Sequence, residues 1–178
     1  MTSLDLKFVR SRFPAFSSEA LRDKAFFENA GGSYACQPVI DRLTRFYTER
    51  KVQPYGPYAA SAAGGAEMDE ARSRLAAMMG VNAHEVSFGP STTQNTYVLA
   101  QAFRRYLKPD EAIVVTDQDH EANSGPWRRL GEEGVEVREW KIDPATGHLD
   151  PARLSPLLAD GKVRLVCFPH CSNVVAEI

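Results

Sequence analysis

Short apolar runs alternate with helical patterns from residue 85 to residue 168, and this alternation constrains the fold more than any other feature. Each run suits one strand, and each helical pattern is long enough to connect two parallel strands. Such an order is typical of parallel βαβ units with right-handed crossovers, so we predict an α/β fold with a mostly parallel sheet and flanking helices. The expected elements are a strand at 85–88, a helix at 92–107, a strand at 112–116, a helix at 126–133, a strand at 135–142, a helix at 151–159 and a strand at 163–168.

The chain before residue 85 has helical patterns and turn signals without this alternation. We expect a helix at 5–13 that Pro14 ends, a strand at 25–27, a helix at 38–50, a loop at 52–65 and a helix at 66–79 that Gly80 ends. The sequence shows no internal repeat and no obvious linker between domains. We therefore predict helices and loops at 1–65, followed by the first part of a large α/β domain at 66–178.

Three polar segments follow, or nearly follow, apolar runs. They are Ser-Thr-Thr at 91–93, Asp-His-Glu-Ala-Asn at 119–123 and His-Cys-Ser-Asn at 170–173. Loops that leave the carboxyl ends of parallel strands line one crevice of an open α/β sheet, and ligands bind there. A hydroxyl cluster, an imidazole and a carboxamide are thus expected to converge on one ligand.

The segment that begins at Ser91 has two interpretations. Ser91 with Gln94 three residues later is typical of a capping box, which by itself accounts for these residues. Alternatively, free amides at the helix start and the hydroxyls of Thr92 and Thr93 hold a phosphate. The preceding Gly89 favours a tight turn that a ligand can approach. The sequence contains neither GxxxxGK[ST] nor GxGxxG, so the usual nucleotide motifs are absent.

The acidic segment 117–121 raises the possibility of a metal site, because hard cations prefer clustered carboxylates. Adjacent residues at a strand end point in different directions, however, so we predict a solvated acidic loop and no metal. His120 alone would be a hydrogen-bonded structural histidine. Cys167 and Cys171 lack a second cysteine pair at zinc spacing, and we interpret both as structural. Asn173 alone would cap a turn.

The bulk composition is that of an ordinary globular protein, with 43% apolar and 25% charged residues. A formal net charge of -2 gives no electrostatic reason to expect nucleic acid. No apolar stretch approaches membrane-spanning length, and the first residues lack the pattern of a signal peptide. Three cysteines do not suggest a disulfide framework. We therefore expect a cytoplasmic, reducing location, with neither nucleic acid nor membrane as partner.

Taken together, the motifs resemble the class V aminotransferase group of pyridoxal 5'-phosphate (PLP) enzymes, in particular its cysteine desulfurase and selenocysteine lyase branch. The resemblance runs from Arg12 to the last residue. The matching motifs, in chain order, are Arg-Phe-Pro at 12–14, Phe-Glu-Asn-Ala-Gly-Gly at 27–32, Ser-Thr-Thr at 91–93, Asp-His-Glu-Ala-Asn at 119–123, Pro-Trp at 126–127, Gly-His-Leu-Asp at 147–150 and Ser-Asn at 172–173. Such a collinear series is far more specific than any single motif.

The resemblance implies a cofactor site in a partial large domain of the PLP-dependent transferase type I fold. Thr92 and Thr93 would donate to the cofactor phosphate, in agreement with the independent argument from the helix start. His120 would lie flat on the pyridine ring and could assist proton transfer. Asn173 would contact the cofactor hydroxyl or the substrate carboxylate.

The implied substrate is an amino acid, whose carboxylate would border the main chain of Ala30 and Gly31. The implied chemistry is condensation of the cofactor with the amino acid, withdrawal of electrons into the ring and cleavage of a bond at the α- or β-carbon. Many desulfurases carry Arg-Gly-x-His where this chain has Pro-Tyr-Gly-Pro-Tyr at 54–58. Substrate contacts from that loop are therefore not carried over.

A family member would be less than half complete at Ile178. The resemblance places beyond it the aspartate that pairs with the pyridine nitrogen, the Ser-x-His-Lys segment with the Schiff-base lysine, and a small C-terminal domain. Family sheets resemble the order 3-2-4-5-7-6-1, so the strand at 85–88 would lack its native neighbour. The lysines without the Schiff-base context are Lys7, Lys24, Lys51, Lys108, Lys141 and Lys162.

We accordingly expect the isolated chain to be inactive. It would need a complementing C-terminal segment or chain, and the complete protein would form a homodimer. Two other classes of function stay open at this point. One is a non-catalytic PLP-fold partner subunit, which would need no lysine. The other is a phosphate-binding α/β module that does not recognise PLP.

Overall fold

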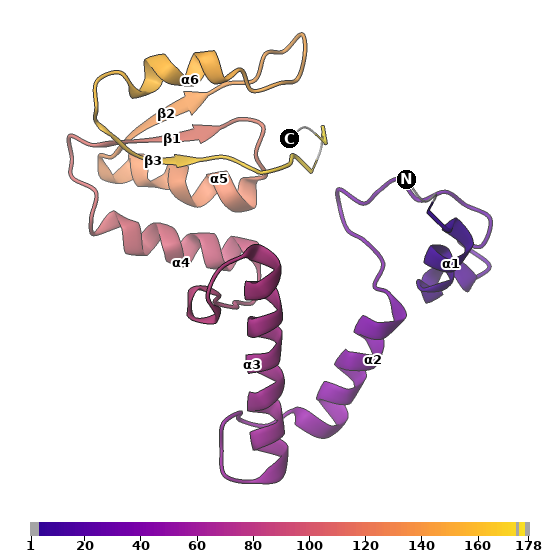
Figure 1. The fold of residues 1–178 in the computed structure, drawn as a ribbon. Helices are drawn as coiled ribbons and strands as arrows, with labels where there is room; N and C mark the ends of the chain where they lie inside the picture. The colour runs from indigo at the N-terminus through magenta and orange to yellow at the C-terminus, as the bar shows by residue number, and fades with distance from the viewer. Residues whose placement is uncertain (1–3, 174, 177–178) are drawn as a thin grey trace. The chain divides into compact units, whose positions relative to one another are not determined.

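The computed structural model describes residues 4–173, 175 and 176, which form parts of two compact units. Unit 1 runs from Met1 to Ser87 and unit 2 from Phe88 to Ile178 (Figure 1). Each unit is described by itself. The boundary expected at 65/66 falls inside one continuous helix of unit 1, and it remains a proposal for the domain division of a complete protein.

All regular secondary structure in the described part of unit 1 is helical. Asp5 caps the first helix, because its carboxylate accepts a hydrogen bond from the Phe8 amide over 2.9 Å. The helix expected at 38–50 is present as an α-helix that continues into a π-helical turn. The elements are α1 (Leu6–Ser11), η1 (Pro14–Ser17), α2 (Gln37–Arg45), η2 (Phe46–Arg50), α3 (Ala59–Met79) and η3 (Ala83–Glu85).

Two expectations for the segments before residue 66 are wrong. The loop predicted at 52–65 ends early, because α3 begins at Ala59. Its alanine-rich first turns favour helix, and buried Ser61 links them to the preceding segment. The Ser61 hydroxyl donates to the main-chain oxygen of Gln53 and accepts from the Gly56 amide over 2.6 Å. The segment 25–27 is not a strand, since it pairs with no strand of the described chain.

The strand predicted at 85–88 is also absent from the described residues. Glu85 ends the 3-10 turn η3, and residues 86–88 pair with no strand. Val86 has an extended main chain, with φ -103° and ψ 120°. An extended segment becomes part of a sheet only when a neighbour satisfies its N–H and C=O groups, and the sequence pattern cannot supply that neighbour.

Unit 2 is an α/β sandwich built on a parallel sheet, which confirms the predicted fold class. The strand order is β2-β1-β3, with both pairs parallel. In register, Thr116 of β1 lies beside Trp140 of β2, and Val115 lies beside Cys167 of β3. The elements are α4 (Thr92–Arg104), β1 (Ala112–Thr116), α5 (Glu121–Arg128), η4 (Arg129–Glu133), β2 (Glu136–Trp140), α6 (Pro151–Leu158) and β3 (Val163–Cys167).

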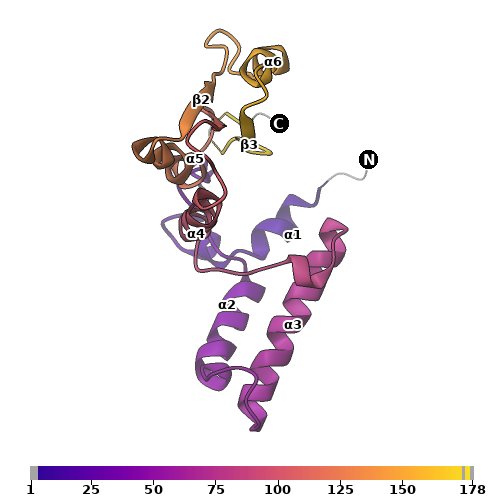
Figure 2. The same cartoon turned by 90° about the vertical axis from the view of Figure 1, so that its left-hand side faces the viewer.

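The core of unit 2 lies between the sheet and the helices α4 and α5. Ile113 and Val115 of the fully buried strand β1 face this side, where they pack with Trp127 and Leu130. The ring of Phe103 meets Trp127 edge-on at 5.8 Å, which joins α4 to α5. Figures 1 and 2 show α6 on the opposite face of the sheet from α5.

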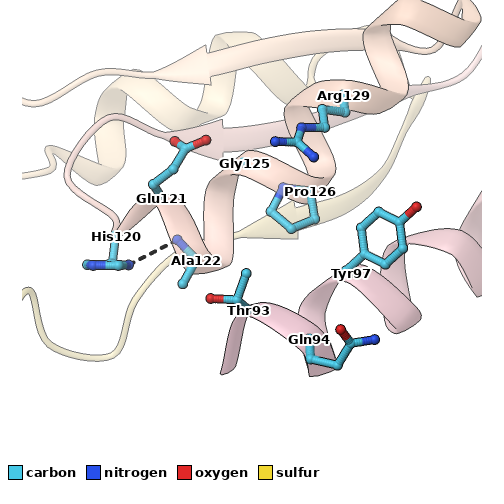
Figure 3. Close-up of a pocket in the computed structure, with 9 residues that line it drawn as sticks. All are labelled: Thr93, Gln94, Tyr97, His120, Glu121, Ala122, Gly125, Pro126 and Arg129. Carbon is cyan, nitrogen blue, oxygen red and sulfur yellow. Dashed lines mark hydrogen bonds between the residues drawn. The ribbon is translucent and has the colours of Figure 1, made fainter. Parts of the chain in front are cut away.

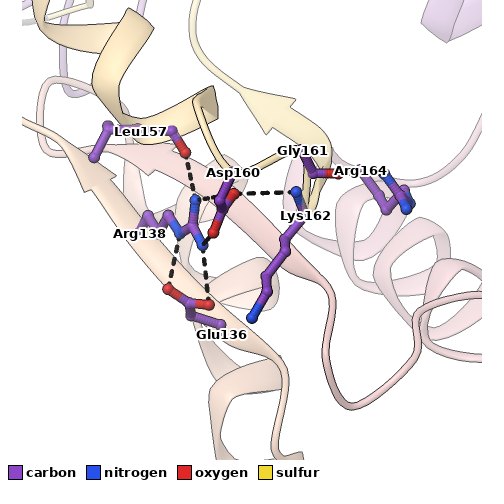
Figure 4. A network of polar contacts seen from close by, with 7 residues as sticks. All are labelled: Glu136, Arg138, Leu157, Asp160, Gly161, Lys162 and Arg164. Carbon is purple, nitrogen blue, oxygen red and sulfur yellow. Dashed lines mark hydrogen bonds and ion pairs between the residues drawn. The ribbon is translucent and has the colours of Figure 1, made fainter.

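An arginine network holds α6 near the outer strand β2. The Arg138 guanidinium donates to both carboxylate oxygens of Glu136, and it also donates to Asp160 and to the main-chain oxygen of Leu157 (Figure 4). The Asp160 carboxylate also accepts from the Lys162 amide over 3.1 Å. The network therefore joins β2 to the end of α6 and to the start of β3.

The helix predicted at 126–133 begins five residues earlier than expected, at Glu121, and changes to a 3-10 turn after Arg128. Pro126 lies inside α5 and not at its start. The reason is that His120, and not a residue next to the proline, caps the helix.

Candidate cofactor site

The loops that leave β1, β2 and β3 are joined at one edge of the unit 2 sheet. Asp117, just after β1, accepts a hydrogen bond from the Ile142 amide over 2.8 Å. The Gln118 side chain donates to the main-chain oxygen of Gly147 over 3.0 Å, and the main-chain oxygen of Gln118 accepts from the Ser172 hydroxyl over 3.4 Å. Polar groups from three loops thus meet at the carboxyl ends of parallel strands, where ligands bind in open α/β sheets.

The start of α4 offers free hydrogen-bond donors. The Ser91 hydroxyl accepts from the Gln94 amide over 3.2 Å, which confirms its capping role. The exposed Thr92 and Thr93 side chains form no hydrogen bond with any other described residue. Their main-chain N–H groups lie in the first turn, before the ladder of intrahelical bonds begins. Capping therefore accounts for Ser91 but leaves two hydroxyls and two amides available, a donor set that fits a phosphate.

His120 occupies the N-cap position of α5. Its Nδ1 accepts a hydrogen bond from the Ala122 amide over 2.9 Å (Figure 3). An imidazole nitrogen that accepts carries no proton, so in the neutral ring the proton is on Nε2. The ring is exposed, and the cap holds its orientation while leaving Nε2 free of that contact.

A cavity of about 320 Å³ lies between α4 and α5 and brings two of the sequence-predicted residues together. Thr93 and His120 both line it (Figure 3). Tyr97 and Arg129 extend its wall away from them, and the exposed Arg129 side chain forms no ion pair with any other described residue. Thr93 and Tyr97 are four residues apart on α4 and so share a helix face.

The other predicted site residues do not line this cavity. Thr92 directly precedes the cavity residue Thr93 in the sequence. Asn173 lies exposed in the loop after β3. Ala30 and Gly31 belong to unit 1, where the amides of Gly31 and Gly32 donate to the Glu28 oxygen over 3.2 and 3.3 Å.

The acidic residues near His120 have separate protein partners. Asp117 accepts from the Ile142 amide, and Asp119 accepts from the Asn123 side chain. Within the part of the chain that the structure describes, no three carboxylate, imidazole or thiol side chains group as metal ligands would. Burial raises the pKa of the Cys167 thiol to about 12, with the Asp119 charge as a smaller cause. Cys167 is therefore a protonated, unreactive thiol at neutral pH.

The family model for class-V aminotransferases matches residues 25–177. The chain belongs to the class V aminotransferase family. A cysteine desulfurase from Serratia proteamaculans (strain 568) is 33% identical over 181 residues, which cover 99% of this chain and 44% of that protein. This class V chain thus spans less than half the length of that curated relative.

Solved structures show the same fold. The cysteine desulfurase CsdA from Escherichia coli superposes with a TM-score of 0.77 at 21% identity, covering 98% of this chain and 43% of that one. A C-DES mutant with glycine covalently linked to its PLP cofactor has a TM-score of 0.64 at 19% identity, covering 88% of this chain and 39% of that one. In this class V chain, none of the described helices is long and apolar enough to span a membrane.

Sequence reasoning missed two residues that organise this region of the class V chain. Gln118 bridges the loops after β2 and β3, and Arg128 of α5 donates to the main-chain oxygen of Thr116 over 3.1 Å. Both side chains have partners far away in the sequence, so no local pattern identifies them. Tyr97 and Arg129 could have been identified from the sequence. Tyr97 follows Thr93 by four residues and Arg129 follows Gly125 by four residues, so helical spacing places each on the face of a cavity residue.

Proposed function

We propose that this chain is the N-terminal portion of a PLP-dependent enzyme that acts on an amino acid, of the cysteine desulfurase or lyase type. The observation that carries the proposal is the start of α4, where Thr92 and Thr93 present unengaged donors and Thr93 shares a cavity with His120. A phosphate group and a planar ring in one ligand would use both features. Membership of the class V family supports PLP as that ligand.

The chain's own residues would bind and orient the cofactor. The Thr92 and Thr93 hydroxyls and amides would donate to its phosphate, assisted by the positive end of the α4 dipole. His120 would lie against the pyridine ring, in an orientation that its bond to the Ala122 amide maintains. Because Nδ1 accepts that bond, Nε2 is the His120 atom that would hold or move a proton. Asn173 would contact the cofactor hydroxyl or the substrate carboxylate.

When bound, PLP would supply an electron sink for cleavage at the α- or β-carbon of an amino acid. The main chain of Ala30 and Gly31 would border the carboxylate of that amino acid. The Schiff-base lysine and the acid partner of the pyridine nitrogen would come from a complementing C-terminal segment or chain. The complete enzyme would act as a cytoplasmic homodimer, and the isolated chain would be inactive.

The phosphate site can be tested in the complete enzyme with the double substitution Thr92→Ala and Thr93→Ala. Loss of two hydrogen bonds to a charged group should cost roughly 3 kcal/mol of binding free energy, which weakens PLP about a hundredfold. Ser155→Ala, at an exposed position of α6 on the opposite face of the sheet from α5, is the matched control and should leave the PLP dissociation constant unchanged. Absorbance titration with PLP measures all three proteins.

Unchanged PLP affinity in the double variant would contradict the assignment of Thr92 and Thr93. Binding of inorganic phosphate without preference for PLP would instead favour the phosphate-binding module. Association with a complete homologue, without cofactor absorbance, would favour the non-catalytic partner subunit.

A further inference from the structure

The Arg10 guanidinium organises the segment before the glycine-rich turn of unit 1. Its Nη2 donates to the main-chain oxygens of Leu21, Arg22 and Lys24 over 2.9, 3.1 and 2.9 Å. The guanidinium carbon also lies 4.3 Å from the ring centroid of Phe16, a cation–π contact. Arg10 forms no ion pair within the described residues, so its donors serve the main chain of this segment.

Ring contacts extend from Arg10 to both ends of the segment 29–33. Phe16 meets Tyr34 edge-on, with ring centroids 5.7 Å apart, and Tyr34 lies 5.1 Å from Phe26. Phe26 precedes the segment and Tyr34 follows it. The three carbonyl bonds of Arg10 hold the chain that leads into Phe26, so both flanks of the segment depend on the same guanidinium.

The segment 29–33 has few contacts of its own that could hold its shape. The Gly31 and Gly32 amides both donate to the main-chain oxygen of Glu28. The Ser33 hydroxyl donates to the Asn29 side chain over 3.1 Å. All of these groups are exposed, and water competes for such bonds. Asn29 and Ser33 border a cavity of about 300 Å³, of which Arg10 is also a wall. Rigidity must therefore come from the aromatic flanks.

We infer that Arg10 is a positioning residue for substrate binding. It holds the segment 29–33 in the conformation in which the main chain of Ala30 and Gly31 receives the amino-acid carboxylate, and it acts through Phe16, Tyr34 and the 21–24 carbonyls. This inference rests on the proposed function, which assigns Ala30 and Gly31 to the substrate. A lysine does not reproduce this arrangement, because its compact ammonium group lacks the guanidinium that lies over the Phe16 ring while Nη2 reaches the three carbonyls.

The test compares Arg10→Lys with Arg12→Lys in the complete enzyme. The Arg12 guanidinium lies 6.0 Å from the Phe8 ring centroid and donates no side-chain hydrogen bond within the described residues, so it is a matched control. We expect Arg10→Lys to accelerate amide hydrogen exchange in residues 26–34 about tenfold. We also expect the KM for the amino acid to rise about tenfold, with kcat within about twofold and PLP affinity unchanged. Arg12→Lys should alter none of these quantities.

The outcomes separate this inference from the proposed function. Equal exchange in Arg10→Lys and Arg12→Lys would overturn the positioning role. Faster exchange with an unchanged KM would overturn both this inference and the assignment of Ala30 and Gly31 to the substrate, while the test of Thr92 and Thr93 stays independent. If Arg10→Lys does not fold, Phe16→Leu removes the ring contact and keeps the carbonyl bonds. Phe16→Leu should also accelerate amide hydrogen exchange in residues 26–34 and raise the KM for the amino acid. An unchanged exchange rate or an unchanged KM would again overturn the inference.

Discussion

The Arg128 guanidinium donates a hydrogen bond of 3.1 Å to the main-chain oxygen of Thr116. Thr116 is the last residue of β1, and Arg128 is the last residue of α5. The same guanidinium pairs with Glu139 of β2 and lowers the pKa of that carboxyl. One side chain therefore joins α5 to the two strands β1 and β2. It ties the end of α5 to the end of β1, and the loop between these two elements leads to His120, the N-cap of the helix.

Arg128→Lys should destabilise this junction. A lysine ammonium cannot reach the Thr116 oxygen and the Glu139 carboxylate with the geometry of a guanidinium, so we expect the free energy of unfolding to fall by about 1 kcal/mol. Arg105→Lys, at the exposed C-cap residue of α4, should change the free energy of unfolding by less than about 0.5 kcal/mol. Denaturant unfolding of the complete enzyme measures both variants, and equal stability would count against the junction.

His120→Asn should separate the two roles of His120. Asparagine is a good N-cap residue, so the free energy of unfolding should stay within about 0.5 kcal/mol of the parent. The variant lacks an imidazole, however, and amino-acid turnover by the complete enzyme should fall about a hundredfold. His120→Ala, which also lacks a cap, should lose both stability and turnover. Full turnover in His120→Asn would show that the imidazole serves only as a cap.

The isolated chain should be catalytically incomplete. PLP needs an amine for its covalent attachment and an acid partner at its ring nitrogen, and no lysine of this chain has the family's context. Mixed with PLP and treated with borohydride, the chain should show no specific lysine label and no turnover of cysteine, whereas the complete protein should be labelled. Stoichiometric labelling of one lysine together with lyase activity would overturn this expectation.

Asp160 should contribute stability that disappears in acid. The Arg138 guanidinium, followed by the Lys162 amide, holds the pKa of Asp160 far below its ordinary value of 3.8. A carboxyl whose pKa is lower in the folded state stabilises the fold above its ordinary pKa, and this contribution is lost as the pH falls toward the folded pKa. The destabilisation by Asp160→Asn should therefore be full at neutral pH and should shrink as the pH falls below 3.8.

The matched control for Asp160 is Asp110→Asn, at a turn residue before β1 with no ion pair in the described chain. Urea unfolding at several pH values measures the parent and both variants. A destabilisation by Asp160→Asn that does not depend on pH would mean that the carboxylate charge is not what Arg138 recognises.

Much of unit 2 could be predicted because its signals are local. The run Ala112–Thr116 is apolar without alternation and is buried at every position, as a central parallel strand must be. Its neighbours β2 and β3 lie within the predicted ranges, and the alternation of strands and helices was sufficient to predict that the strands are parallel. Ser91 was also a local signal, because a cap acts on the helix that immediately follows it.

The errors have both local and long-range causes. The start of α3 depends on Ser61, which bonds to a segment that local helix rules assign to a loop. The start of α5 depends on a histidine cap, which is outside the usual set of capping residues. The segments 25–27 and 86–88 have strand-like composition, but a strand also needs a paired neighbour.

The sequence by itself determined the chemistry of the candidate site: two hydroxyls at a helix start, an imidazole after one strand and a carboxamide after another. Local contacts at the helix starts decide which of these groups are free, whereas only the tertiary structure brings Thr93 and His120 to one cavity. The Ser91 hydroxyl is engaged as a cap, while the Thr92 and Thr93 hydroxyls are not. The Nε2 atom of His120 stays available because Nδ1 accepts the hydrogen bond from the Ala122 amide. Gln118 bonds to Gly147 and Ser172, which lie 29 and 54 residues further along the chain. Hydrogen bonds of that span depend on the folded path of the chain, which no local window of sequence contains.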